Sequence, residues 1–326
     1  MTGYLLRRIF YALPILIGVN LITFALFFMV NSPDDMARMQ LGVKRVTPEA
    51  IQQWKAERGY DKPLFINESA HGLNQVTQTI FFEKSARLFA GDFGRSEDGR
   101  EIGQEIRERM GPSLAIAVLT FVIGLGLTVS LALFLVLFRG TWLDRTGVVI
   151  CVGLMSISSL FFIIGGQFLF ARVLQLVPIS GYSSNPLVAW HFLILPVLVA
   201  VVAGVGGSTR WYRTLFLEEI AKDYVRTARA KGLSDAAVLF RHVLRNGLIP
   251  ILTGVVVVIP SLFMGSLLLE SFFGIPGLGS YTIDAIAAQD FAVVRAMVFL
   301  GSVLYLVGLI LTDLSYTLVD PRIRLK

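Results

Sequence analysis

The chain has 326 residues, of which 55% are hydrophobic and 16% charged, with a net charge of +6 and a mean hydropathy of +0.69. Soluble proteins average roughly 45–50% apolar and 25% charged residues, so this composition excludes a disordered chain and argues against an ordinary soluble enzyme. The charges are unevenly spread, because 25 of the 52 Asp, Glu, Lys and Arg residues lie within residues 31–112. The other 244 residues contain long uncharged tracts, which predicts a polytopic membrane protein with one hydrophilic insertion.

Residue types that build catalytic and metal sites are scarce. Cys151 is the only cysteine, which excludes an intrachain disulfide and a cysteine-based metal site. His71, His191 and His242 are far apart in the sequence, and no Gly-x-x-x-x-Gly-Lys-Ser/Thr loop for nucleotide phosphates occurs. We therefore expect no catalytic residue, no cofactor and no metal in this chain.

Six apolar tracts are long enough for membrane-spanning helices, which need about 20 residues each. They are residues 9–30, 114–138, 147–170, 191–207, 248–269 and 293–311. The first tract resembles the core of a cleaved signal peptide in that Arg7 and Arg8 precede it. However, it is longer than the roughly 7–15 residues of a signal core, and no small-x-small cleavage site follows, so we expect a retained anchor.

Lys and Arg in the short loops predict the orientation. With both termini in the cytoplasm, 15 basic residues fall on that side, whereas the short loops at residues 178–189 and 271–292 contain none. The expected fold is an all-α membrane protein with six transmembrane helices. The expected domains are an N-terminal helix (1–30), an extracytoplasmic insertion (31–112) and a five-helix core (113–326). The positive charge thus reports topology, and no nucleic-acid partner is expected.

The insertion is predicted to be partly helical. Thr47 followed by Pro48 is typical of a helix start, a second helical tract covers residues 74–89, and residues 99–109 form a third. Two readings remain open: a lid that packs on the bundle, and a docking surface for a soluble partner.

The segment between the fourth and fifth spans, residues 208–247, is much longer than the roughly 2–8 residues that usually join helices in a bundle. We expect a helix over residues 211–230, a left-handed stop at Gly232, and a second helix over residues 235–245 capped by Ser234. A solvated connector and a partner-docking element are both compatible with this pattern, and in the second case the small residues Ala228, Ala230 and Gly232 would allow close approach. A DNA-reading helix-turn-helix is disfavoured because both ends are tied to membrane spans.

The cytoplasmic loop and six further strings along the chain resemble the bacterial ABC importer permeases of the dipeptide and oligopeptide branch. The signature loop is matched by DYVRTARAKGLS (223–234) with RHVLRNGLIP (241–250). Further matches are LLRR (5–8), GDFGRS (91–96), RGTWLDR (139–145), VPISGY (177–182), FGIPGLG (273–279) and DPRIR (320–324). The resemblance covers nearly the whole chain.

This resemblance implies a transport subunit of the bacterial plasma (inner) membrane that is not itself an enzyme. The implied partners are a second homologous permease, one or two ABC ATPase subunits on the cytoplasmic side, an extracytoplasmic solute-binding protein and membrane lipid. The residues implied to dock on the ATPase are Asp223, Tyr224, Val225, Arg226, Thr227, Ala228, Arg229, Ala230, Lys231 and Gly232. Two departures stand out: Arg226 replaces an acidic residue of the general importer pattern, and residues 65–88 do not follow the family's common sequence.

Two other classes compete with the importer. An ion-driven secondary transporter would carry internal repeats and mid-span acids, which the sequence lacks; a membrane scaffold would use the 208–247 loop to recruit an effector. Glu270, Asp313 and Arg172 lie at span ends and are expected to be structural. Ser156, Ser158 and Ser159 with Gln167 fit either a substrate pathway or helix packing, so the substrate pathway stays unassigned.

Overall fold

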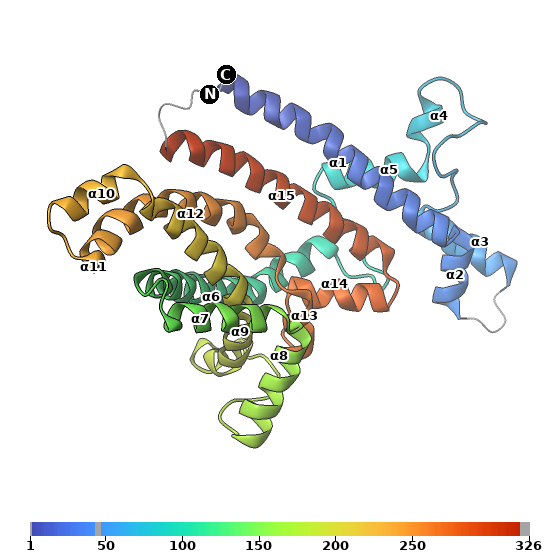
Figure 1. Ribbon diagram of the computed structural model, residues 1–326. Coiled ribbons are helices and arrows are strands. Elements are labelled where there is room, and N and C mark those ends of the chain that lie inside the picture. The colour runs from blue at the N-terminus through green and yellow to red at the C-terminus, as the bar shows by residue number, and fades with distance from the viewer. Residues whose placement is uncertain (1, 43–46, 320–326) are drawn as a thin grey trace. The chain divides into compact units, whose positions relative to one another are not determined.

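The computed structural model describes residues 2–42 and 47–319 (Figure 1), so the string at 320–324 lies outside the described residues. All regular elements in these ranges are helices. The described residues form two compact units, one from those up to residue 107 with 284–306, and the other from residues 108–283 with 307–319. Three helices continue from one unit into the other: α6 (Ile102–Leu137), α14 (Leu278–Ala287) and α15 (Phe291–Val319).

Five helices of the described chain are long and apolar enough to cross a membrane. They cover Phe10–Val30, Ile102–Leu137, Leu187–Ile220, Asp235–Met264 and Phe291–Ser315. The helix pair Trp142–Met155 and Ser159–Val173 passes the same test only when both parts are taken together, and it bends by 90°. The six predicted spans are thus matched if this bent pair counts as one.

The third predicted span, residues 147–170, is not a continuous helix. Helix α7 (Trp142–Met155) ends at Ser156, and α8 (Ser159–Gly166) starts after Ser158, whose backbone is extended (φ −62°, ψ 144°). The Ser156 hydroxyl donates to the Val152 carbonyl at 2.9 Å. Because serine hydroxyls compete with backbone groups for helical hydrogen bonds, the serine cluster permits the break that a hydropathy argument overlooks.

The first unit contains α1 (Thr2–Val30), α2 (Pro33–Leu41), α3 (Pro48–Arg58), α4 (Asn74–Thr77) and α5 (Ile80–Phe89). The predicted start of α3 is confirmed, since the Thr47 hydroxyl accepts from the Ala50 N–H at 3.3 Å. The helix predicted at residues 74–89 is instead split, because Thr79 is extended and caps α5 by accepting from the Phe82 N–H. Of the helix predicted at residues 99–109, residues 102–109 are helical, but they form the start of α6 and not a separate helix.

An aromatic cluster packs the divergent segment 65–88 onto α1. The ring of Phe24, 1% exposed, makes edge contacts with Phe65 and Phe81 at centroid distances of 5.3 and 5.2 Å. Nearby, the Asn20 amide donates to the Ser85 hydroxyl at 2.6 Å. Burial of such rings contributes on the order of 2 kcal/mol each, so this segment belongs to the packed core of the first unit.

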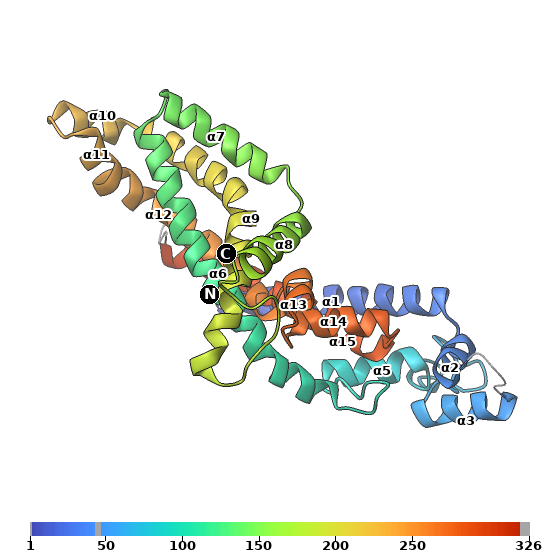
Figure 2. The same ribbon diagram turned by 90° about the horizontal axis from the view of Figure 1, so that it is seen from below.

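The second unit is built around α9 (Pro186–Ile220), against which α7 and α8 pack (Figure 2). Small residues allow this close packing. A Cβ at Gly206 would lie 2.5 Å from the Cys151 carbonyl oxygen of α7, and one at Gly166 would lie 2.6 Å from a Val199 methyl. The bundle therefore relies on glycine at helix contacts, as membrane helices commonly do.

A buried glutamate organises the segment that follows η3 (Ile259–Met264), where α13 (Leu267–Phe273) leads into α14. Glu270 is 1% exposed, and its carboxylate accepts from the N–H groups of Ser266 (3.0 Å), Gly279 (2.6 Å) and Ser280 (3.1 Å). The Ser113 hydroxyl of α6 accepts from the Leu278 N–H at 2.7 Å. These hydrogen bonds agree with the structural role expected of Glu270.

Candidate functional site

The centre of the candidate site is the loop at residues 221–234, called here the α10 loop. Helix α9 continues to Ile220, so the single helix predicted over residues 211–230 is wrong. Lys222 is extended (φ −73°, ψ 153°), and the short helix α10 (Asp223–Ala230) begins after it. The break turns the last part of the predicted helix into a separate element.

The end of the α10 loop follows the prediction. Gly232 has φ 81°, a left-handed conformation that favours glycine, and the Ser234 hydroxyl accepts from the Ala237 N–H at 3.3 Å. The helix predicted over residues 235–245 does not end at residue 245. Helix α11 (Asp235–Val238) continues through η2 (Leu239–Val243) into α12 (Leu244–Val258), so the α10 loop is held between two long helices.

One face of α10 is packed against those helices. Val225 is fully buried and Ala228 is 6% exposed, in a hydrophobic cluster with Phe216 of α9 and Leu239 and Val243 of η2. Ala228 therefore faces the interior, and of the three small residues considered for close approach only Ala230 and Gly232 lie at the surface.

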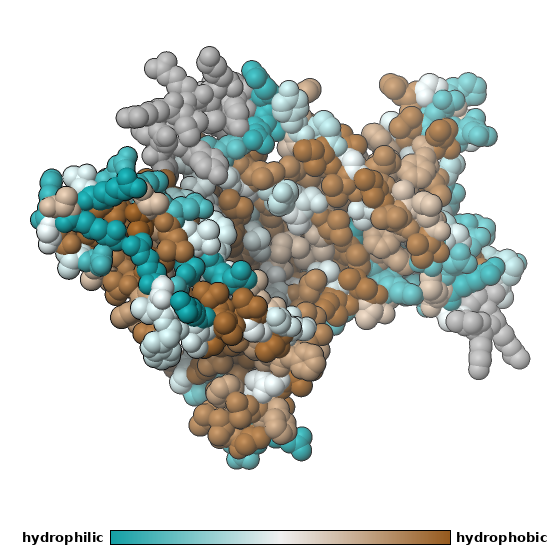
Figure 3. Space-filling model, viewed as in Figure 1, coloured by the Kyte–Doolittle hydropathy of each residue, from teal (hydrophilic) through white to brown (hydrophobic). Residues whose placement is uncertain are grey.

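The opposite face of α10 is exposed and charged. Positions three and four apart share a face of a helix, and the exposed residues follow that spacing: Asp223, Arg226, Thr227, Ala230 and Lys231. Figure 3 shows hydrophilic residues gathered over α10 and α11. Residues 208–247 contain eight Lys and Arg against four Asp and Glu, so this face suits an acidic protein surface.

Polar contacts fix the shape of the α10 loop. Arg229 pairs with Asp235 of α11 at 3.0 Å, and the Tyr224 hydroxyl donates to the Glu219 carboxylate at 2.9 Å. Burial raises the pKa of Tyr224 above its usual value of 10, so the phenol keeps the proton that it donates. The ten residues from Asp223 to Gly232, for which the resemblance implies docking, thus lie on one short, braced helix and the turn that ends it.

Sequence reasoning missed an ion pair next to this loop. Arg213 of α9 binds Asp144 of α7 through two parallel bonds of 2.8 Å, and Asp144 also accepts from the Gly140 N–H at 3.1 Å. The Asp144 side chain is 8% exposed and that of Arg213 is 21% exposed. This pair joins the RGTWLDR turn to the helix that carries the α10 loop; the residues are 69 positions apart, so no local pattern announces it.

The polar residues considered for a substrate pathway have structural contacts. The Gln167 amide donates to the carbonyls of Ile179 (3.1 Å) and Phe272 (3.0 Å), which joins η1 (Gln167–Val173) to α13. Ser156 and Ser158 form the break between α7 and α8. These contacts favour the packing interpretation of the cluster.

Several long apolar helices, with a short, charged, braced helix between two of them, define a polytopic membrane protein. The chain belongs to the family of binding-protein-dependent transport system inner membrane components, whose model matches residues 124–325. The N-terminal model of the same membrane components matches residues 1–117. It is therefore an inner-membrane transport subunit.

Its relatives are similar over their whole length. The chain is 32% identical to the "Probable peptide ABC transporter permease protein y4tP" of Sinorhizobium fredii, and the alignment covers 99% of this chain and 100% of the relative. It is 30% identical to the oligopeptide transport system permease protein AppB of Bacillus subtilis, with 99% of each chain covered. It is 29% identical to the dipeptide transport system permease protein DppB of Escherichia coli, with 100% of each covered.

Proposed function

We propose that this chain forms half of the translocation path of an ABC importer for small peptides. The names of relatives that match from end to end support a peptide substrate. A second, homologous permease completes the path as a heterodimer, and an extracytoplasmic binding protein delivers the peptide. This chain performs no chemistry itself, because ATPase subunits in the cytoplasm hydrolyse the ATP.

The observation that carries the proposal is the α10 loop: a short helix with a buried apolar face and an exposed basic face. Its exposed residues Arg226, Thr227 and Lys231 contact the ATPase, and the buried Val225 and Ala228 transmit the movement to α9 and η2. A ligand shifts a conformational equilibrium only through contacts that differ between its states. ATP-driven closure of the ATPase therefore acts on the bundle through this loop and produces alternating access.

The proposed topology places both termini and the α10 loop in the cytoplasm, and residues 31–112 outside. The absence of Lys and Arg from residues 178–189 and 271–292 supports this orientation. Cysteine substitutions at exposed positions, for example Lys231 and Glu68, test it by labelling with an impermeant maleimide in intact cells. Labelling should be confined to the substitution at Glu68, and labelling of the Lys231 position instead would reverse the topology.

Co-purification tests the docking role. Arg226→Glu should release the ATPase from the purified complex, because the Arg226 side chain is 78% exposed and its one ion pair among the described residues is with Asp223, at 3.5 Å. Arg100→Glu is the matched control, since its side chain is 63% exposed in the other unit. ATPase retention by the Arg226 variant, with coupled ATP hydrolysis intact, would overturn the assignment.

Two more drastic changes in the same loop report on folding and make poor docking tests. Ala228→Glu places a carboxylate in the cluster around Phe216 and destabilises the loop by more than about 2 kcal/mol. Gly232→Pro is incompatible with φ 81°. Both variants should lose coupled transport together with stability, whereas the Arg226 variant should keep its stability.

Uptake of a labelled dipeptide by cells carrying the whole transporter tests the substrate. ATP-dependent uptake that requires the binding protein supports the importer. Uptake driven by an ion gradient in the absence of any ATPase would instead support a secondary transporter, and a stable complex that moves no solute would support a membrane scaffold.

A further inference from the structure

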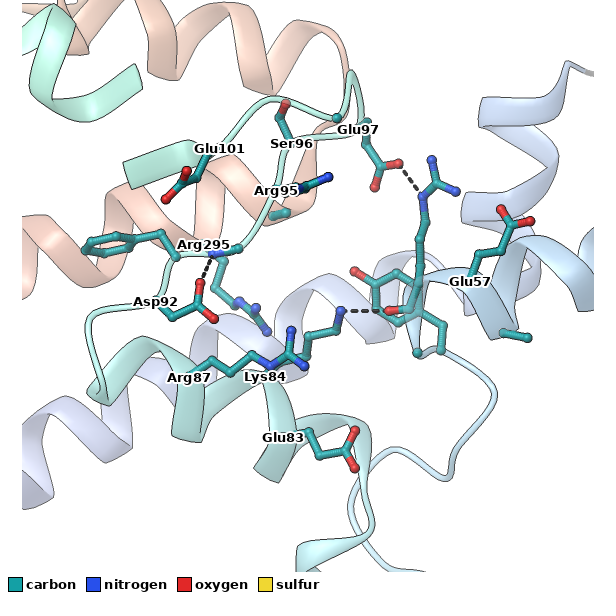
Figure 4. A pocket seen from close by; sticks show the side chains of 18 residues that line it. Glu57, Glu83, Lys84, Arg87, Asp92, Arg95, Ser96, Glu97, Glu101 and Arg295 are labelled. Carbon is teal, nitrogen blue, oxygen red and sulfur yellow. Dashed lines mark hydrogen bonds and ion pairs between the residues drawn. The ribbon is translucent and has the colours of Figure 1, made fainter. Parts of the chain in front are cut away.

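The first compact unit contains a polar cavity that the translocation path and the α10 loop do not explain. Its volume is about 750 Å³. Four segments line it: the end of α3 with Tyr60, one face of α5, the turn at residues 92–101, and the start of α15 with Arg295. All of these residues belong to the same compact unit (Figure 4).

Three basic side chains meet in this cavity: Lys84 and Arg87 of α5, and Arg295 of α15. In Figure 4 the guanidinium groups of Arg87 and Arg295 lie close together, and the Lys84 ammonium lies beside them but points toward the Arg58 carbonyl. Burial, followed by the charges of Arg295 and Arg87, lowers the pKa of Lys84 to about 8. The cations are therefore close enough to repel one another, an arrangement that costs free energy while the cavity holds no anion.

These bases have no carboxylate partner among the described residues. The Lys84 ammonium donates to the Arg58 carbonyl at 2.7 Å and lies 4.9 Å from the centroid of the Tyr60 ring, and neither group carries a full negative charge. The Arg295 Nε is buried and has no hydrogen-bond partner in the described chain. An unsatisfied buried donor costs about 1–3 kcal/mol, so its presence in a folded protein calls for an acceptor.

Three of the five acids that line the cavity already have partners. Glu97 pairs with Arg58 at 2.9 Å, Glu83 pairs with Lys62, and the Asp92 carboxylate accepts from the Gly94 N–H at 2.9 Å. None of these pairs involves the three clustered bases. An external anion is thus the missing partner.

The donors indicate which anion fits. Two guanidinium groups and an ammonium group suit a planar carboxylate, which accepts parallel bonds from an arginine fork. Glu57 and Glu101 also line the cavity, away from the three bases (Figure 4), where they would attract an ammonium group. A cavity of this size with both kinds of charge matches a zwitterion of a few residues.

We propose that this cavity binds a small peptide through its C-terminal carboxylate, with Lys84, Arg87 and Arg295 as the carboxylate ligands. The inference rests on the proposed peptide function and adds to it a peptide site on the permease, outside the translocation path. In the proposed topology this site faces the compartment from which the peptide arrives. It offers the peptide a holding position before transport.

Calorimetric titration of the full chain in lipid nanodiscs tests the site, with dialanine and dialanine amide as probes. Dialanine should bind, and the amide, which lacks the carboxylate, should bind at least about tenfold more weakly. Arg87→Gln and Arg295→Gln should each weaken dialanine binding by a similar factor, whereas Arg38→Gln, an exposed change in α2, should not. Arg87 is exposed, so its variant stays informative even if the Arg295 variant fails to fold.

Three results would overturn the proposal. They are equal affinity for dialanine and its amide, unchanged dialanine binding by both arginine variants, and inorganic phosphate binding as tightly as dialanine. If dialanine does not bind and Arg87→Gln instead weakens capture of the binding protein, the carboxylate is a side chain of that protein and the peptide site is rejected. Dipeptide uptake by cells is measured separately, so that uptake without direct binding rejects only this site.

Discussion

The Glu270 carboxylate provides the sharpest test of how the second unit is held together. In Glu270→Ala, the N–H groups of Ser266, Gly279 and Ser280 lose their shared acceptor. Each buried donor left unsatisfied costs about 1–3 kcal/mol, partly offset because the buried charge disappears, so we expect a destabilisation of about 3–6 kcal/mol. Glu270→Gln keeps one oxygen but turns an amide donor toward another donor, and should cost about 2–4 kcal/mol.

Thermal unfolding of the purified protein in detergent measures this effect. The order of stability should be wild type, then Glu270→Gln, then Glu270→Ala, with Glu68→Gln as an exposed control that leaves the midpoint unchanged. Gly277→Ala should resemble the Glu270 variants, because a Cβ there would collide with the Glu270 carboxylate and the Ser113 hydroxyl. A Glu270→Gln variant as stable as the control would refute the argument that these backbone bonds depend on the charge.

Three further predictions concern other parts of the chain. Asp144→Asn should destabilise the protein by about 2–4 kcal/mol, because it leaves the half-buried Arg213 without its charge partner. In a double-mutant cycle, the variant that also carries Arg213→Gln should recover part of that stability. Gly232→Ala should cost about 1 kcal/mol in thermal unfolding through its left-handed backbone alone, since no atom lies within 4 Å of the added Cβ; a cost above about 3 kcal/mol would contradict this. The pKa of Lys84 is about 8 in the folded protein, below the ordinary 10.5, so the Lys84 charge opposes folding below pH 8. This cost of about 3 kcal/mol disappears as the pH rises from 8 to 10.5, so the protein should become more stable over that range. In a pH profile of stability, Lys84→Met should remove that rise.

Local features of the chain were predictable because short-range physics controls them. The apolar tracts follow from the length a helix needs to cross a bilayer. The starts of α3 and α11 follow from side-chain caps at Thr47 and Ser234, and the end of the α10 loop follows from the freedom of Gly232 to adopt a positive φ. For the two caps and the glycine turn, the residues that decide the structure lie within four positions of one another.

Helix boundaries were less predictable where two outcomes have similar local energies. Residues 211–230 have a helix-favouring composition throughout, yet the helix breaks at Lys222, because the break allows Val225 and Ala228 to bury their side chains against Phe216 and η2. The third apolar tract breaks at its serine cluster, where hydroxyl groups compete for the hydrogen bonds of the helix. Burial of apolar area outweighs the small propensity differences between such residues.

By itself, the sequence determined that the chain is an all-helical membrane protein, and its motifs indicated the transport family. Only the tertiary structure decided which face of α10 is exposed, which backbone groups the Glu270 carboxylate serves, and that Lys84 and Arg87 meet Arg295. The last two residues are separated by more than 200 positions. A cavity and its charges depend on such distant pairs, because side chains brought together by packing leave no periodic or adjacent pattern in the chain.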